Sequence, residues 1–206
     1  NTAGALRLND SSTVTISSKV VLNDSTGGVV GRTDSIKFAS SPKIVLNDGY
    51  KVAVQDSLLK DLSTFGVLVL NMDGPADSLI LNQSITVTDS LIINDGGLAT
   101  TANDYSISLG DGAVVQIDQA EDPIQGNKTA FVTTDDYSLI FKATNDLGND
   151  SLLVNNEVSL IVDGTSAATV TLPGTHTQLV DITVGSADAI AVSDGDTLTI
   201  SGTVDF

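Results

Sequence analysis

The feature that most restricts how this chain can fold is an alternation of apolar and polar residues with period two, which returns along its whole length. In the clearest case, Leu198, Ile200, Val204 and Phe206 occupy the even positions of the last segment, and mostly Ser, Thr and Asp lie between them. Successive side chains of a β-strand point to opposite faces, so this pattern places the apolar residues on one face of a sheet. Similar runs recur at roughly 8 to 12 residues, a spacing typical of all-β domains.

Turn residues separate these runs. Asp-Gly occurs at 48–49, 73–74, 95–96, 111–112, 163–164 and 194–195. Gly tolerates positive φ and Asp caps its own backbone, so each pair predicts a turn. Glu occurs only at positions 121 and 157, and Lys and Arg together number 9. Helix surfaces draw on these residue types, so helix is not expected to be the main element.

The predicted fold is an antiparallel β-sandwich of jelly-roll or Greek-key type, with one short helix near residues 56–65. Asp56 or Ser57 can cap that helix, and Gly66 can end it. A length of 206 residues suits one domain. We divide it into an N-terminal strand segment with a Gly-rich joint (1–31) and a β-sandwich domain (32–206).

A short phrase, Leu/Ile-Asn-Asp, begins at residues 8, 22, 46 and 93, with spacings of 14, 24 and 47. Because these spacings show no fixed period, we interpret the phrase as a strand end followed by an Asn-Asp turn. A solenoid of stacked strands is the alternative, but it would demand a regular repeat.

The residues needed for common catalytic sites are scarce. Cysteine is absent and His176 is the only histidine. No Gly-x-Ser-x-Gly elbow, phosphate loop or dinucleotide fingerprint occurs. Paired carboxylates are easy to find among so many Asp residues, but Trp, which often stacks on sugars in glycosidases, is absent. We therefore expect no catalytic residues and no enzymatic activity.

The formal net charge is −17. It would repel nucleic acid, and no segment approaches the roughly 20 apolar residues of a membrane span, so neither nucleic acid binding nor membrane insertion is expected. Carboxylates on turns suit Ca²⁺, which prefers hard oxygen ligands, and Ca²⁺ is the cofactor we consider. Solvated acidic turns are the alternative explanation. The candidate ligands are Asp135, Asp136, Asp146, Asp150, Asp194 and Asp196.

Glycosylation sequons begin at Asn9, Asn23, Asn82, Asn127 and Asn149, and they suggest glycans on an exported surface. A surface rich in Ser, Thr, Asn and Asp is typical of exported proteins. The start at Asn1 without Met is compatible with removal of a signal peptide. We therefore expect an extracellular or cell-surface location.

The segment from Ser12 to Leu22 alternates like a strand and is followed by glycines at positions 27, 28 and 31. Such a strand could insert into the sheet of a neighbouring subunit, or it could pair within its own domain. The residues that would fill the neighbour's pockets are Val14, Ile16, Val20 and Leu22.

In its layout, this chain resembles secreted filament subunits that polymerise by donor-strand complementation, such as TasA-like fibre proteins, archaeal bundling pili and cannula subunits. The resemblance implies self-assembly outside the cell and, in some such assemblies, calcium at subunit contacts. The expected function is thus a structural subunit of an extracellular filament, tube or surface layer. The alternative is a monomeric adhesin or ligand-binding β-sandwich module of a surface or viral protein.

Overall fold

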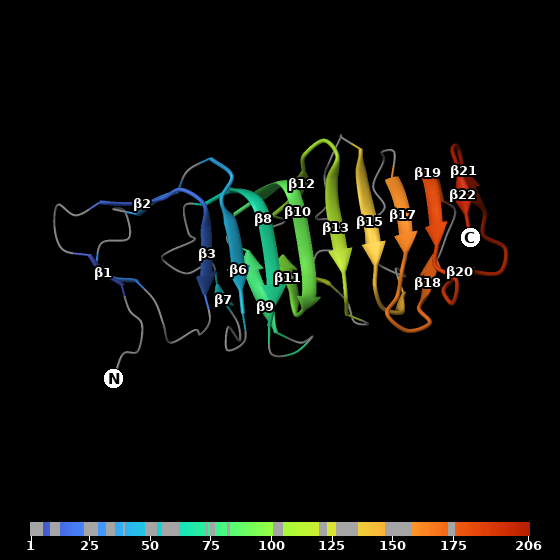
Figure 1. The fold of residues 1–206 in the computed structure, drawn as a ribbon, viewed down its shortest axis with the longest axis horizontal. Helices are drawn as coiled ribbons and strands as arrows, with labels where there is room; N and C mark the ends of the chain where they lie inside the picture. The colour runs from blue at the N-terminus through green and yellow to red at the C-terminus, as the bar shows by residue number, and fades with distance from the viewer. Residues whose placement is uncertain are drawn as a thin grey trace.

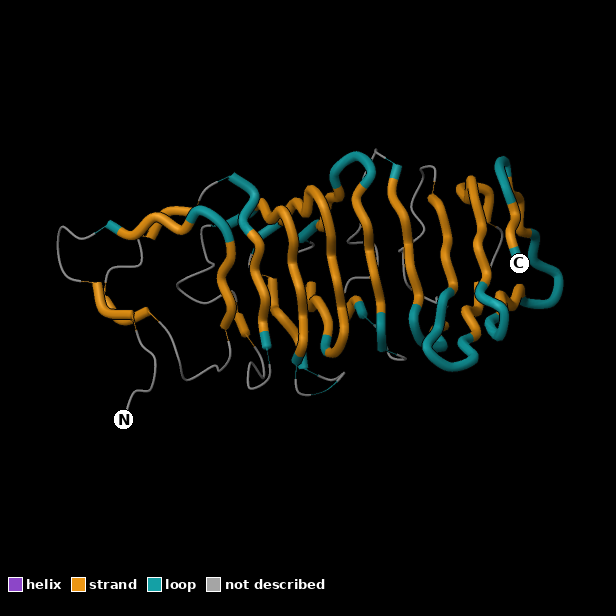
Figure 2. Tube along the Cα trace, in the orientation of Figure 1, coloured by secondary structure: helices purple, strands orange, loops and turns teal. Residues whose placement is uncertain are grey.

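The fold is a parallel β-solenoid, in which the chain winds through successive coils and each coil pairs its strands with the next (Figure 1). It is seen in a computed structural model that describes residues 6–8, 13–22, 29–31, 36–38, 40–47, 53–54, 62–72, 74, 77–81, 83–100, 105–119, 123–126, 136–146, 158–172 and 176–206. Figure 2 shows the strands of the described part standing side by side in a row along the long axis.

One long 11-stranded sheet runs through the described coils. In spatial order its strands are β3 (Lys19–Leu22), β6 (Lys43–Leu46), β8 (Thr64–Asn71), β10 (Ile85–Asp95), β13 (Ala113–Ile117), β15 (Tyr137–Phe141), β17 (Val158–Val162), β19 (His176–Val184) and β21 (Leu198–Ile200). The other two are β12 (Ile107–Leu109), which pairs with β10, and β22 (Val204–Asp205), which pairs with β19.

Shorter sheets carry the chain between the strands of the long one. The first contains β7 (Ala53–Val54), β9 (Ser78–Leu81), β11 (Gly97–Thr100) and β14 (Ile124–Gly126), and the second contains β16 (Asn145–Asp146), β18 (Thr169–Leu172) and β20 (Ala189–Val192). Near the N-terminus, β1 (Leu6–Leu8) pairs with β4 (Val29–Gly31), and β2 (Val14–Ile16) pairs with β5 (Ile36–Phe38).

The predicted antiparallel β-sandwich is wrong, because the strand pairs that the structure describes are parallel. Lys43 pairs with Val67, and Val114 pairs with Ser138, in each case one full coil further along the chain. Alternation reports only that one face of a strand is buried; it does not report the direction of the neighbouring strand. In a coil, turns and short strands bring the chain back to the edge of the long sheet before the next long strand begins. The sequence of a coil therefore contains the same turn residues as a hairpin, and these residues do not distinguish the two folds.

The predicted helix near residues 56–65 is also wrong where the structure describes it. Thr64 and Phe65 open strand β8, and Leu62 and Ser63 precede it without helical structure. Residues 56–61 lie outside the described part. Leu62 and Phe65 are nevertheless buried, so their apolar character reflects the core of a coil rather than one side of a helix.

The core is a set of aliphatic stacks along the inside of the solenoid. Strands β12, β13, β15 and β17 of the long sheet bury alternate residues, as the pattern Ala113-Val115-Ile117 shows for β13. The last buried position of successive strands forms one stack: Leu46, Leu70, Ile93, Ile117, Phe141, Val162 and Val184. Dispersion and apolar burial along such stacks hold each coil to its neighbours.

An asparagine ladder lies directly after this stack. Asn71 Nδ2 donates to Asn47 Oδ1 at 2.8 Å, and Asn94 Nδ2 donates to Asn71 Oδ1 at 2.5 Å. The Leu/Ile-Asn-Asp phrases that begin at Leu22, Leu46 and Ile93 therefore mark successive coils, and interpreting them as aperiodic was wrong. The phrase at Leu8 lies in a separate sheet. Leu70-Asn71 is a further member of this series, but it is followed by Met72 instead of Asp, so the phrase is incomplete there. As a result, the two similar steps from Leu46 to Leu70 and from Leu70 to Ile93 look like a single long gap.

Asp188 joins two coils through its carboxylate. Its Oδ2 accepts from Gly164 N at 2.9 Å and its Oδ1 accepts from Ala168 N at 2.8 Å, and both donors lie one coil earlier in the chain. Both N–H groups belong to the turn that precedes β18. Without this carboxylate they would need other partners, since unpaired buried N–H groups are costly.

We expect the substitution Asp188→Ala to lower the free energy of unfolding by about 2–3 kcal/mol, because two charge-assisted hydrogen bonds are lost together. Urea unfolding measures the change, and hydrogen exchange should speed up at Gly164 and Ala168. Asp194→Ala, at an exposed position in the turn after β20, is the matched control. If both variants unfold at the same urea concentration, Asp188 does not hold these coils together.

Candidate binding face

The outward side of the long sheet is the most regular surface in the described part of the chain. We call it the outer face and divide it into three rows that run along the solenoid axis. The first row is Lys19, Lys43, Val67, Ser90, Val114, Ser138 and Ser159, and it ends at Asp181. The central row is Val21, Val45, Val69, Ile92, Gln116, Ile140, Ile161 and Thr183. The third row is Asn47, Asn71, Asn94, Asp118, Lys142 and Asp163.

The central row is aliphatic over most of its length. Val21 is 39% exposed, whereas Val45 and Val69 are each 7% exposed. Ile92, Ile140 and Ile161 have intermediate exposure. Apolar side chains on the outside of a sheet are uncommon in a row of this length, so the outer face differs from an ordinary solvated surface.

The third row is polar and internally bonded. Beyond the asparagine ladder, Lys142 Nζ forms an ion pair with Asp163 Oδ2 on the next coil. Gln116, in the central row, donates through Nε2 to Asp118 Oδ1 at 2.9 Å. The asparagine ladder and the ion pair link neighbouring coils along the row.

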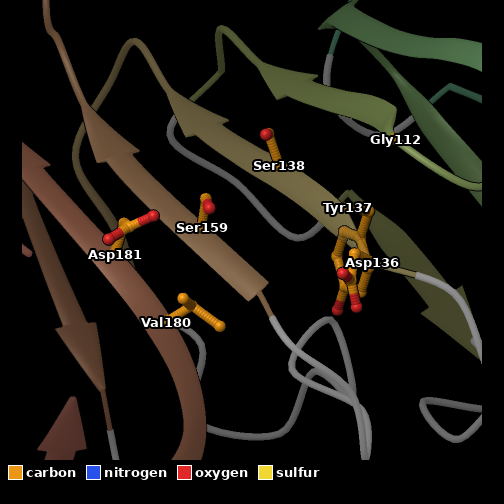
Figure 3. Close-up of a pocket in the computed structure, with 7 residues that line it drawn as sticks. All are labelled: Gly112, Asp136, Tyr137, Ser138, Ser159, Val180 and Asp181. Atoms are coloured by element: carbon orange, nitrogen blue, oxygen red, sulfur yellow. The ribbon is translucent and has the colours of Figure 1, made fainter. Parts of the chain in front are cut away.

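A shallow pocket of about 220 Å³ opens on the first row near the C-terminal coils (Figure 3). The residues that line it are Gly112, Asp136, Tyr137, Ser138, Ser159, Val180 and Asp181. Ser138 and Ser159 are register partners on β15 and β17, which places their side chains side by side.

Asp181 reaches the pocket because β19 is irregular at this point. Val158 pairs with Leu179 and Leu160 pairs with Ile182, so β19 holds one more residue than β17 between these pairs. The carboxylate is fixed from the next coil, where Thr203 N donates to Asp181 Oδ1 at 2.7 Å. A bulge of this kind re-aims side chains, and here it contributes a carboxylate to a row of hydroxyl groups.

Chemically, the residues that line the pocket offer two carboxylates, three hydroxyl groups (of Tyr137, Ser138 and Ser159) and no basic side chain. Such a set accepts hydrogen bonds and attracts a positive charge, as an ammonium group or a cation would supply. A serine nucleophile would need a base within hydrogen-bond reach. The lining residues include no histidine or lysine to act as that base.

The structure brings few of the predicted calcium ligands together. Asp136 lines the pocket, Asp146 ends β16, and Asp194 and Asp196 flank Gly195, which has φ +86°, in the turn before β21. Asp135 and Asp150 lie outside the described residues. Among the residues that are described, no group of three or more His, Cys, Asp or Glu side chains is placed to hold a metal ion.

The predicted donor-strand residues lie in strands that pair within the chain. Val14 and Ile16 belong to β2, whose partner is β5, and Val20 and Leu22 belong to β3, whose partner is β6. Val20 packs against the core. The exchange of this segment between subunits stays a prediction.

The remaining predicted sites are placed only in part. His176 begins β19, where it pairs with Leu198 of β21. The sequon residues Asn9, Asn23, Asn82, Asn127 and Asn149 all lie outside the described part of the chain. Within the described part, no helix is long and apolar enough to cross a membrane.

Comparison with known proteins returned no relatives. No family model, no curated protein and no solved structure matches this chain. Function is therefore inferred from the geometry of the outer face and of the coils.

Sequence reasoning missed the residues that define this face. Asp181, Ser138 and Ser159 carry no motif, and the alternation alone does not say which strands are neighbours. One signal could have found them. Sliding the chain against itself by the step that separates Asn47 from Asn71 stacks Lys19 on Lys43, and it stacks Val21 on Val45 and Val69.

Proposed function

We propose that the protein is a non-enzymatic structural element of an extracellular or cell-surface assembly, in which the solenoid acts as a stiff rod. The observation that carries this proposal is the continuous pairing of the long sheet from β3 to β21 over a single core. Its backbone hydrogen bonds run along the axis of the rod, so every coil is bonded to the next. Repeat proteins of this kind extend in one dimension and gain stability from each neighbouring interface.

Composition supports the same proposal. A net charge of −17 keeps a rod soluble, and a surface of Ser, Thr, Asn and Asp with few Lys and Glu is typical of exported proteins. Self-assembly into a filament, tube or layer is the form of the function we favour, and calcium at subunit contacts is part of it. A binding module is the alternative, and the pocket lined by Asp136 and Asp181 is the observation that favours it.

Electron microscopy of the purified protein, with and without millimolar Ca²⁺, tests the assembling role. We expect filaments, tubes or sheets, and we expect calcium to promote them if carboxylates of neighbouring copies share the ion. Single short rods or closed dimers in both conditions would contradict self-assembly into an extended structure. The binding module would then be the better explanation, and binding of cationic peptides or glycans to the pocket would be the next measurement.

A further inference from the structure

Asp-Gly pairs carry a chemistry of their own, because the main chain can close on the Asp side chain. The Gly nitrogen attacks Cγ of the Asp, one carboxyl oxygen leaves as water together with the amide proton, and a five-membered succinimide forms. Water then opens the ring. Attack at Cγ restores Asp, whereas attack at the main-chain carbonyl breaks its bond to the Gly nitrogen and leaves isoaspartate, in which the chain runs through Cβ and Cγ. One water is released and one is taken up, so no other reactant is needed.

The surroundings of each pair in the fold decide which of them react, since the reacting groups are the same in all. Asp48 and Asp73 lie outside the described residues. The other pairs begin at Asp95, Asp111, Asp163 and Asp194. Reaction requires a Gly nitrogen that is not held elsewhere and room for the ring to close.

In three of these four pairs a hydrogen bond holds the Gly N–H group. The bonds run from Gly96 N to Asp95 Oδ1, from Gly112 N to Asp136 O and from Gly164 N to Asp188 Oδ2, each at 2.9 Å. Each bond directs the hydrogen at its acceptor and must break before the nitrogen can attack. Gly195 N, by contrast, donates to no residue in the described part of the chain.

Space around the glycine is the second condition. A Cβ added at Gly96 would lie 2.7 Å from Met72 Sδ, and one added at Gly164 would lie 2.5 Å from Ser166 O. At Gly112 and Gly195 no such atom lies within 4 Å. Only Gly195 therefore combines open surroundings with a nitrogen that no described residue holds.

We propose that Asp194 is a site of spontaneous isoaspartate formation in the folded protein, and that it reacts before the other described Asp-Gly pairs. Asp194 and Gly195 are both exposed, in the turn that joins β20 to β21 (Figure 1). Asp196 N donates to Ser193 O at 3.1 Å across this turn. An exposed turn of this kind opens locally at little cost, which lets the nitrogen approach Cγ.

Isoaspartate at this position would change the coil that follows it. The product adds one atom to the main chain between β20 and β21. Leu198 and Ile200 of β21 pack against the core, so a longer turn alters how that strand is held. Amide hydrogen exchange should therefore rise in β21 of the aged protein and stay unchanged in β13. This chemistry does not depend on the proposed structural role, because it takes place within one chain.

Incubation of the whole folded chain in heavy-oxygen water, at physiological temperature and pH, tests the proposal. Each ring opening inserts one heavy oxygen, and electron-transfer fragmentation of the peptides distinguishes isoaspartate from Asp. We expect isoaspartate to form at Asp194 about fivefold or more faster than at Asp95, Asp111 or Asp163, since a backbone hydrogen bond that must first break costs about 1 kcal/mol.

Two controls separate the effect of the fold from that of the sequence. In urea the hydrogen bonds and the crowding are lost, so the four rates should become similar. Asp194→Glu keeps the charge of the turn but would have to close a larger ring, so it should remove the label at this position. Asp194 reacting no faster than the other three in the folded chain would overturn the proposal. An equal preference for Asp194 in urea would overturn it too, because the fold would then not be its cause.

Discussion

Phe141→Ala should cost more stability than any other substitution considered, about 3–5 kcal/mol. Phe141 is fully buried and lies in the stack between Ile117 and Val162, so the variant would leave a cavity shared by three coils. A typical domain is stable by only about 5–15 kcal/mol, so this loss is a large fraction of the total. Urea denaturation followed by circular dichroism measures it.

The response to Phe141→Ala should also be local, because coils interact mainly with their neighbours. Amide hydrogen exchange should rise first in β13, β15 and β17 and least in β6. Thr171→Ala, at an outward position, is the control and should change stability by less than about 0.5 kcal/mol. A loss below about 1 kcal/mol for Phe141→Ala would mean that this stack is not the main source of cohesion between coils.

Gly66→Ala is the second substitution for which we expect a large effect, a loss of about 1–3 kcal/mol. A Cβ at this position would lie 2.5 Å from Ser41 O and 3.2 Å from Ser41 C, both backbone atoms. Gly66 N also donates to Pro42 O at 3.0 Å, so the backbone of one coil would have to move away from the other. The measurement is again the free energy of unfolding in urea.

Gly74→Ala is the matched control, because no atom lies within 4 Å of the Cβ it would add. It should be neutral or slightly stabilising, since Ala reduces the conformational entropy of the unfolded chain. Equal stabilities for the two alanine variants would show that the coils near Gly66 separate easily.

The sequence predicts the strands of this protein well and their partners badly. The alternation in Leu198 to Phe206 and in Ile85 to Ile93 correctly indicates strands, and the turn at Gly195 has the positive φ that an Asp-Gly pair favours. Strand direction is a tertiary property. A period-two pattern is the same whether the neighbouring strand is parallel or antiparallel. In the sequence, only a long-range repeat would distinguish a solenoid from a sandwich.

That repeat is present but disguised, because the coils differ in length. The step from Val114 to its partner Ser138 is longer than the next step, from Ser138 to Ser159. Bulges in β10 and β19 shift the register further. The helix prediction relied on Asp56 or Ser57 as a cap and Gly66 as a stop, but Gly66 lies inside strand β8, and the buried Leu62 and Phe65 belong to the core of the coil.

The candidate site could be predicted least. Acidic residues alone suggested calcium ligands on turns, and of the four candidates that the structure describes only Asp136 lines the pocket. The residues that form the outer face are ordinary Val, Ile, Ser and Lys residues that become a surface only once coils are stacked. Their order along the axis, with Lys19 at one end of the first row and Asp181 at the other, cannot be recognised before the register is known.

The coil geometry has a consequence for how the protein reaches its native state. Most strands of the long sheet pair with the strand of the coil just before them, as Lys43 of β6 does with Lys19 of β3. From β3 to β21, each strand of the long sheet pairs with a strand that is one coil away in the sequence. The entropic cost of closing the loop between paired strands therefore stays nearly constant from coil to coil. The growing solenoid can therefore use its own free edge as a template and acquire structure in the direction in which the chain is synthesised.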